Sequence, residues 1–468
     1  MVPTATVGSS TVNLIKTIVG AGLLAVPYAF RADGVCVAAV LVAVAAITSG
    51  FGLVVLAKAS KALVNPRQSS FFALCQITYP RLAVVFDFAM FTQCFGVGVS
   101  YLIIVGDLFP GLLGGTREAW IAASAAVVVP LSHLRRFDSL KYSSVLGLVA
   151  IAYLALMIVA AWIEGLTTGY AHYERGEVRW LRPASLREMV STFSIIVFAF
   201  TGSMNMFSII NELGDNSMRN IQRIVYYSIA ASTALFILVG MAGYLTFGSN
   251  VAQNVILNFD PDAVSTQVGS LALGLMVLLS FPLLFHPGRI AFNNMVHWAH
   301  VTYCGYRPLK SEEQPGDAGA SICLEVEDEE DRLILSAEGS ESYQSLPRGA
   351  NSNEDSGSSA EVDRQAVPFD GPRFYIVTWL LLLVLYLVAF KVRSFAYVLA
   401  LVGATGSTAI SFTLPGLFGY RLIGTDSLMK GNMLSRQDHL YRCASLGLVG
   451  YGIVVTIVSL MVVIYFGI

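Results

Sequence analysis

Eleven stretches of the chain are predominantly apolar over about one membrane thickness, and polar or charged segments separate them. A helix of about 20 apolar residues crosses the hydrocarbon core of a bilayer and pairs its own backbone N–H and C=O groups where water is absent. We expect spans at residues 9–31, 34–58, 81–110, 118–133, 139–163, 189–213, 221–247, 265–285, 374–390, 395–420 and 441–466. The sequence therefore predicts an all-α polytopic membrane protein.

The composition leaves too little polar surface to cover a soluble protein of this length. Hydrophobic residues make up 55% of the 468 residues and charged residues 13%, and the mean hydropathy is +0.66. The charge is concentrated in loops and in one acidic segment, so nucleic acid is not an expected partner. The six cysteines lack metal-ligand spacing and no catalytic triad or carboxylate pair is visible in the spans. We therefore predict no metal, no cofactor and no enzymatic activity.

Lysine and arginine are distributed unequally between the two alternating sets of loops, which predicts the orientation in the membrane. One set holds Lys58, Lys61, Arg67, Arg135, Arg136, Lys141, Arg219, Arg223, Arg421, Lys430, Arg436 and Arg442. The other set holds Arg31, Arg117, Lys391 and Arg393, with four more arginines in the longer loop at 164–187. The N-terminus is expected to be cytosolic and the C-terminus lumenal or extracellular.

An acidic segment at residues 310–370 is rich in Ser, Gly, Asp and Glu and poor in aromatic residues. It cannot bury enough apolar surface to offset its ordering entropy, so we expect a disordered cytosolic loop at 310–372. This loop divides spans 1–8 (residues 1–309) from spans 9–11 (residues 373–468). Inside it, Glu329, Leu333 and Ile334 resemble an acidic dileucine sorting signal, and Tyr343 and Leu346 resemble a tyrosine-based one. The alternative is a solvated linker without a sorting role.

Small residues interrupt two of the spans near their centres. Gly20-Ala21-Gly22 is followed by Pro27 in the first span, and Thr201-Gly202-Ser203 interrupts the sixth. Glycine and proline weaken or remove helical hydrogen bonds, and broken helices in a bilayer are buried in protein or line a polar cavity. Two breaks five spans apart match a pair of five-helix repeats with opposite topology. The alternative is that each glycine only permits close helix packing.

The two breaks offer partners for both charged ends of an amino acid. The backbone amides of Gly20, Ala21 and Gly22 can hold a carboxylate at the start of a half-helix. The carbonyl groups near the second break that can receive an ammonium group are those of Phe198, Ala199 and Phe200. Side chains that can add contacts are Thr17, Thr201 and Ser203, with Tyr101 of the third span closing the site from the side. The predicted substrate is therefore an amino acid.

Several of these motifs resemble the amino acid/auxin permease (AAAP) family. The opening signature is Asn13-Leu14-Ile15, Gly20-Ala21-Gly22-Leu23-Leu24 and Pro27-Tyr28-Ala29-Phe30. Weaker motifs follow in the family's order at 101–107, 130–132, 139–140, 198–200, 211–212, 281–283 and 415–417. The segments 16–20 and 31–34 are most similar to the fungal vacuolar (Avt-type) members. The resemblance implies a LeuT-type (APC superfamily) fold, with a 5+5 inverted repeat plus an eleventh helix, and proton-coupled amino acid transport across a vacuolar or lysosomal membrane.

Three ionisable residues lie in or near the spans. Sodium-coupled members of the family usually carry Asn where this chain has Lys16. Either the Lys16 ammonium replaces the sodium ion and makes transport sodium-independent, or the side chain extends to the cytosolic surface. Glu212 either carries a proton through the transport cycle or caps its helix and pairs with Arg219 or Arg223. Asp107 is expected to order the adjoining loop.

Three functions are compatible with these features. The first is a proton-coupled, sodium-independent transporter that releases amino acids from a vacuole or lysosome to the cytosol by alternating access. The second is sodium- or proton-coupled uptake at the plasma membrane, and the third is an amino acid sensor with little flux. The expected partners are the amino acid, protons, the lipid bilayer and sorting adaptors at the acidic loop.

Overall fold

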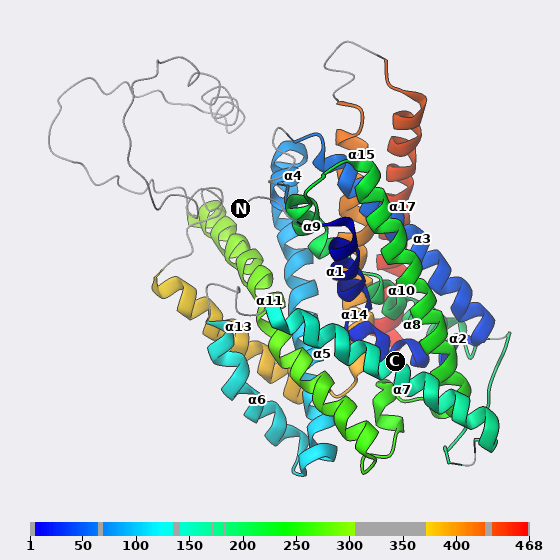
Figure 1. The fold of residues 1–468 in the computed structure, drawn as a ribbon. Helices are drawn as coiled ribbons and strands as arrows, with labels where there is room; N and C mark the ends of the chain where they lie inside the picture. Colours follow the sequence, from blue (N-terminus) through cyan, green and yellow to red (C-terminus); the bar gives the residue numbers. More distant parts are fainter. Residues whose placement is uncertain are drawn as a thin grey trace, which may run out of the picture. The chain divides into compact units, whose positions relative to one another are not determined.

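The computed structural model describes residues 5–63, 69–133, 141–170, 172–181, 183–304, 371–425 and 433–466. The chain divides into two compact units, one comprising Met1–Trp298 and Phe369–Ile468 and the other Ala299–Pro368. The fold of the first unit is drawn in Figure 1. Within the described residues all regular elements are helices, and one isolated β-bridge joins Ala5 and Leu213. The predicted all-α class is confirmed.

The chain forms the following elements, with short 3-10 or π-helical segments labelled η. Up to the second break they are α1 (Val7–Val19), η1 (Ala21–Leu24), α2 (Val26–Asp33), α3 (Val35–Ser60), α4 (Phe71–Thr78), η3 (Pro80–Leu82), α5 (Ala83–Leu113), α6 (Arg117–Ser132), α7 (Lys141–Thr168) and α8 (Leu186–Ala199). After it come η5 (Ser203–Asn205), α9 (Met206–Glu212), α10 (Met218–Phe247), η6 (Gly248–Asn250), η7 (Val255–Asn258), α11 (Val264–Cys304), α13 (Pro372–Lys391), α14 (Phe395–Val402), η8 (Gly403–Ser407), η9 (Ala409–Thr413), α15 (Leu414–Leu422) and α17 (Arg436–Phe466).

Nine helical stretches among the described residues are long and apolar enough to cross a membrane. The predicted first and fourth spans are not among them, because the first is divided into α1 and α2 and α6 has only 16 residues. The predicted end of the eighth span at residue 285 was wrong, since α11 continues to Cys304 through two internal prolines, Pro282 and Pro287. Neighbouring helices can satisfy the carbonyl groups that a proline frees, so proline need not end a membrane helix.

Apolar side chains cover the outer faces of α13 and α17. Ile376 and Leu383 on α13 are 65% and 58% exposed, and Val454 and Ile464 on α17 are 59% and 60% exposed. Such continuous apolar surface is unusual on a soluble monomer and matches a face in contact with lipid. The described structure therefore supports an integral membrane protein.

The first span is enclosed by protein rather than by lipid. In α2, every residue except Arg31 is buried, and α2 packs on α3, α8 and α10. Glycines permit this approach, because a Cβ at Gly243 of α10 would lie 2.9 Å from the Pro27 ring. The broken helix is thus placed in the interior, where unpaired backbone groups can meet protein partners.

The tenth span, α14 to α15, contains two π-helical segments between residues 403 and 413 and contacts α3 closely. A Cβ at Gly52 of α3 would overlap the backbone carbonyl oxygen of Ser411. Because that carbonyl belongs to the backbone, it cannot move aside as a flexible side chain would.

We predict that Gly52→Ala lowers thermal stability, since the added methyl group must push α3 away from the tenth span. The expected cost is about 1–3 kcal/mol, typical of overpacking. Gly450→Ala in α17 is the matched control, because a Cβ there meets no heavy atom within 4 Å. Thermal unfolding in detergent should show a lower Tm for the first variant only; equal Tm values would contradict the proposed close contact.

Candidate functional site

The first break begins at Gly20, where α1 ends with a backbone φ of +31°. A side chain is rarely tolerated at positive φ, which explains a glycine here. The Gly20 N–H donates to the Lys16 carbonyl oxygen at 3.2 Å, so it is used within α1. In the described part of the chain, the amides of Ala21 and Gly22 have no such acceptor. The helix resumes with Pro27 in the first turn of α2, where its missing N–H has no cost.

The second break follows Ala199, the last residue of α8. The Thr201 N–H donates to the Phe198 carbonyl at 3.0 Å, and the Gly202 N–H donates to the Phe200 carbonyl at 2.9 Å. The Phe198 carbonyl also accepts from the Phe200 N–H, whereas the Phe200 carbonyl retains a second lone pair. No backbone N–H among the described residues donates to the Ala199 carbonyl. This carbonyl is the least engaged of the three that the sequence singled out.

The two breaks lie directly against each other. A Cβ at Gly22 would approach Ala199 Cα and Cβ to 2.9 Å, and one at Gly202 would approach Ile18 Cγ1 to the same distance. Glycine at both positions is therefore required by the contact between the breaks. Among the described residues, the break that contains the unpaired amides of Ala21 and Gly22 therefore contacts the break that contains the unpaired Ala199 carbonyl.

A side-chain hydrogen bond also joins the two broken spans. Asn205 Nδ2 donates to Thr17 Oγ1 at 2.9 Å, and Thr17 Oγ1 donates to the Asn13 carbonyl at 3.0 Å. Asn205 was not among the predicted site residues, although a carboxamide just after a helix break was a visible signal. Thr17 thus contacts η5, directly after the second break.

The remaining predicted site residues, Thr201, Ser203 and Tyr101, are all buried but differ in their hydrogen bonds. Thr201 and Ser203 are buried, and Thr201 Oγ1 donates to the Val197 carbonyl at 3.2 Å. Tyr101 is buried within α5, and no hydrogen bond of its hydroxyl to any described residue is found. The main packing partners of α5 are α6, α14, η8 and α13.

Lys16 lies half-buried in the last turn of α1, facing α7 and α11. A Cβ at Gly147 of α7 would lie 3.2 Å from Lys16 Cε and 3.3 Å from Met276 Cγ of α11. No hydrogen bond or ion pair of its ammonium group to the described residues is found. Three helices therefore surround the stem of a charged side chain, one turn before the first break.

Glu212 is exposed at the end of α9 and lies away from the breaks. Its carbonyl accepts from the Ala5 N–H at 3.2 Å, and the Gly214 N–H donates to the Ala5 carbonyl at 3.0 Å. Beside it, Asn211 Nδ2 donates to the Ser69 carbonyl at 3.0 Å. These bonds tie α9 to the residues before α1 and α4, and in Figure 1 α4 and α9 lie at the same end of the bundle.

The tenth span supplies contacts that the sequence reading missed. Ser407 Oγ donates to Gln93 Oε1 of α5 at 2.7 Å, and both side chains are buried. A Cβ at Gly406 would approach the Gln93 backbone to 2.8 Å, and one at Gly403 would overlap the Ser194 carbonyl of α8. The run of Gly, Ser and Thr residues at 403–408 was the sequence feature from which close contacts of the tenth span could have been predicted.

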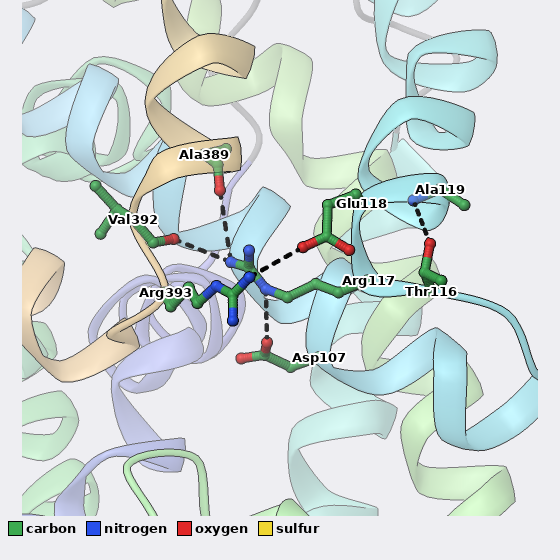
Figure 2. A network of polar contacts seen from close by, with 8 residues as sticks. All are labelled: Asp107, Thr116, Arg117, Glu118, Ala119, Ala389, Val392 and Arg393. Carbon is green, nitrogen blue, oxygen red and sulfur yellow. Dashed lines mark hydrogen bonds and ion pairs between the residues drawn. The ribbon is translucent and has the colours of Figure 1, made fainter.

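A polar network lies at the other end of α5 from α4 (Figure 2). Arg117 Nε lies 3.2 Å from Asp107 Oδ1, and a terminal nitrogen of Arg117 donates to the Val392 carbonyl at 3.0 Å. Arg393 and Glu118 form an outer pair at 3.4 Å. Arg117 therefore joins α5, α6 and the end of α13.

A cavity of about 180 Å³ opens beside this network, between the end of α5, η7 and the start of α11. Its polar lining comes from Asp107, Thr266, Gln267 and Ser270. The loop predicted at 310–372 lies almost wholly outside the described residues, as do the predicted sorting residues Glu329, Leu333, Ile334, Tyr343 and Leu346.

The family model described as "Transmembrane amino acid transporter protein" matches residues 3–458. The chain belongs to this amino acid/auxin permease family. It is an amino acid transporter and not an enzyme, which confirms both predictions.

Members of the family from fungi and animals are similar to this chain over different lengths. It is 48% identical to vacuolar amino acid transporter 7 of Saccharomyces cerevisiae, covering 98% of this chain and 97% of that protein. It is 33% identical to vacuolar amino acid transporter 5 of Schizosaccharomyces pombe, covering 97% and 93%. Solute carrier family 38 member 8 of mouse is 27% identical over 59% of this chain and 66% of that protein.

The crystal structure of MhsT in complex with L-phenylalanine matches this transporter with a TM-score of 0.51 and 12% sequence identity, covering 97% of each chain. At this identity the similarity concerns the fold alone. It confirms the LeuT-type fold class, whereas the 5+5 inverted repeat remains a prediction.

We predict that Gly22→Ala weakens substrate binding by more than about tenfold, because the new methyl group separates the two breaks. Gly8→Ala in the first turn of α1 is the control, since its Cβ would meet only Thr6 Oγ1 at 3.9 Å. Binding of radiolabelled amino acids to purified protein provides the measurement. Equal affinity of the two variants would argue against a site at the breaks.

We predict that Arg117→Leu destabilises the protein by about 3–5 kcal/mol, because it leaves the Asp107 carboxylate partly buried without its partner. Arg393→Leu should cost about 0–1 kcal/mol, since the Arg393 side chain is 78% exposed. Thermal unfolding of both variants in detergent compares them. Similar losses for the two would refute the anchoring role of Arg117.

Proposed function

We propose that this transporter carries amino acids across the vacuolar membrane, with proton coupling, without sodium, and with net export to the cytosol. The observation that carries the proposal is the contact between the two breaks at Gly22 and Ala199. Backbone amides at a half-helix start favour a carboxylate, and a carbonyl without a partner favours an ammonium group. A zwitterionic amino acid satisfies both groups together.

The substrate site that we propose consists of the residues at and around the breaks. They are Thr17, Gly20, Ala21, Gly22, Phe198, Ala199, Phe200, Thr201 and Ser203, with Tyr101 as the side wall. In this site Ala21 and Gly22 bind the carboxylate, and Ala199 receives the ammonium group. Alternating access then follows from opening the helix halves on one side of the breaks at a time.

We assign sodium independence to Lys16. Its stem is held between α1, α7 and α11, and a charge at such depth is stable only when paired or hydrated. An ammonium group there supplies the positive charge that a bound sodium ion would otherwise provide. Glu212, exposed at the end of α9, is the group proposed to release protons to the cytosol.

The vacuolar membrane is proposed from the relatives, whose names describe vacuolar amino acid transporters in two yeasts. A lumen more acidic than the cytosol drives a proton symporter toward export. With the N-terminus in the cytosol, the acidic loop is also cytosolic, and its sorting residues are accessible to sorting adaptors. In cells that have lysosomes in place of a vacuole, the lysosomal membrane is the equivalent location.

Uptake into proteoliposomes under an imposed pH gradient, with and without sodium, tests the proposed coupling. Wild-type flux should follow the proton gradient and ignore sodium, whereas Lys16→Asn should become sodium-dependent or lose transport. Lys58→Asn is the matched control, because Lys58 lies near the end of α3 and pairs with Asp438 at 3.7 Å.

Three results would contradict the proposal. Sodium-driven flux by the wild type would favour an uptake system of the plasma-membrane type. Saturable binding without gradient-driven flux would favour a sensor. An unchanged proton and sodium response in Lys16→Asn would remove the role of Lys16.

A further inference from the structure

A carboxyl group is enclosed at the end of the first span. Asp33, the last residue of α2, has 0% of its surface exposed. The segment before α8 covers it, because the Ala184 N–H donates to the Ala32 carbonyl at 2.7 Å and the Val35 N–H donates to the Arg179 carbonyl at 3.2 Å. The site lies at the opposite end of the first span from Ala5. Under the proposed orientation this end is lumenal.

The hydrogen bonds around Asp33 favour one protonation state over the other. Thr192 Oγ1 of α8 lies 2.9 Å from Asp33 Oδ1, and Asp33 Oδ2 is buried with no hydrogen-bond partner among the described residues. Thr192 Oγ1 also lies 2.8 Å from the Glu188 carbonyl oxygen. A hydroxyl group has a single hydrogen, so it cannot donate to both oxygens.

A proton on Asp33 Oδ1 gives both hydroxyl groups an acceptor and leaves Oδ2 as a neutral oxygen without a donor. The carboxyl O–H then donates to Thr192 Oγ1, and the Thr192 hydroxyl donates to the Glu188 carbonyl. An ionised Asp33 would instead have at most one donor for two buried oxygens, which is costly in a dry environment. The packed arrangement of α2 on α8 therefore favours a neutral Asp33.

Among the residues that the structure describes, no charged group forms an ion pair with Asp33. The charged groups on the neighbouring elements are Arg31 on α2, Arg187 and Glu188 in the first turn of α8, and Arg179 in the covering segment. The Arg31 guanidinium donates to the Val251 carbonyl at 3.0 Å, and Glu188 is exposed and carries the same sign as an ionised Asp33. α3 has no lysine, arginine, aspartate or glutamate before Lys58, and α10 has none after Arg223.

We propose that Asp33 is a proton-binding switch that controls closure of the lumenal half of the transport pathway. α2 and α8 are the lumenal halves of the two broken spans, and they pack as observed only when Asp33 is protonated. Ionisation of Asp33 separates them and admits water. An acidic lumen thus permits closure over the substrate, and the proton bound here need not cross the membrane.

Equilibrium exchange of radiolabelled amino acid in proteoliposomes tests this switch, with equal pH on both sides so that no proton gradient acts. Wild-type exchange should fall as pH rises, approaching about tenfold per pH unit once Asp33 ionises. Asp33→Asn, which stays neutral and keeps a donor for Thr192, should lose this decline. Glu188→Gln is the matched control and should keep the wild-type profile.

Two results would overturn the proposal. The first is an Asp33→Asn variant with the wild-type pH profile. The second is an Asp33→Asn variant that exchanges normally but no longer accumulates substrate under a pH gradient, because Asp33 would then carry the coupling proton itself. Failure of the proposed proton coupling is distinguishable, since it would abolish gradient-driven accumulation in the wild type and leave the decline of exchange with pH.

A second pair of variants tests the switch if Asp33→Asn does not fold. Thr192→Val removes the hydroxyl that accepts from the protonated Asp33 in the packed form, so the midpoint of the decline should move downward by roughly one pH unit. Thr192→Ser keeps the hydroxyl and should keep the midpoint. An unchanged midpoint in Thr192→Val would refute the link between Thr192 and proton binding.

Discussion

Backbone polar groups inside a bilayer need partners, and the rest of this structure depends on how that requirement is met at the two helix breaks. Continuous helices pair their own N–H and C=O groups, but α1 ends at Gly20 and α8 ends at Ala199 within the membrane-spanning region. The breaks are tolerated because, in the part of the chain that the structure describes, they pack against neighbouring helices and not against lipid. The groups at Ala21, Gly22 and Ala199 that have no partner among the described residues are those that we propose bind a zwitterionic substrate.

Small residues make this enclosure possible. Glycines stand at several close contacts between elements, such as Gly22 on Ala199, Gly243 on the Pro27 ring, and Gly52 on the Ser411 carbonyl. Helix packing in membranes relies on such contacts because lipid provides little hydrophobic driving force between helices. Hydrogen bonds between spans, such as Asn205 to Thr17 and Ser407 to Gln93, then determine which helices are joined.

Ionisable groups within the spans have different environments, and these suggest different tasks. Arg289 of α11 is buried, donates to the Ser132 carbonyl at 3.0 Å and to Thr378 Oγ1 at 2.9 Å, and lies 4.0 Å from the Phe374 ring centroid. It joins α6, α11 and α13 and has the character of a structural anchor. Lys16 and Asp33 lie in the same broken span on opposite sides of its break. We propose that both act on the two halves of this span, Lys16 by its charge and Asp33 by binding a proton.

Periodicity and composition were sufficient to predict the membrane class, nearly all the spans and the positions of both breaks. They worked because the cost of burying polar groups in lipid acts on each segment independently of its neighbours. The continuation of α11 beyond residue 285 and the π-helical segments of the tenth span were not predicted, and these segments act through contacts with α3, α5 and α8 that the local sequence does not show.

The sequence by itself determined which segments cross the membrane, where two of them are interrupted, and which family the chain resembles, since these properties reside in local runs of residues. Only the tertiary structure decided that Gly22 meets Ala199, that Lys16 faces α7 and α11, and that Asp33 is enclosed with Thr192. Those pairs are separated by up to 260 positions along the chain. Their contacts arise from the packing of whole helices, which no local pattern specifies.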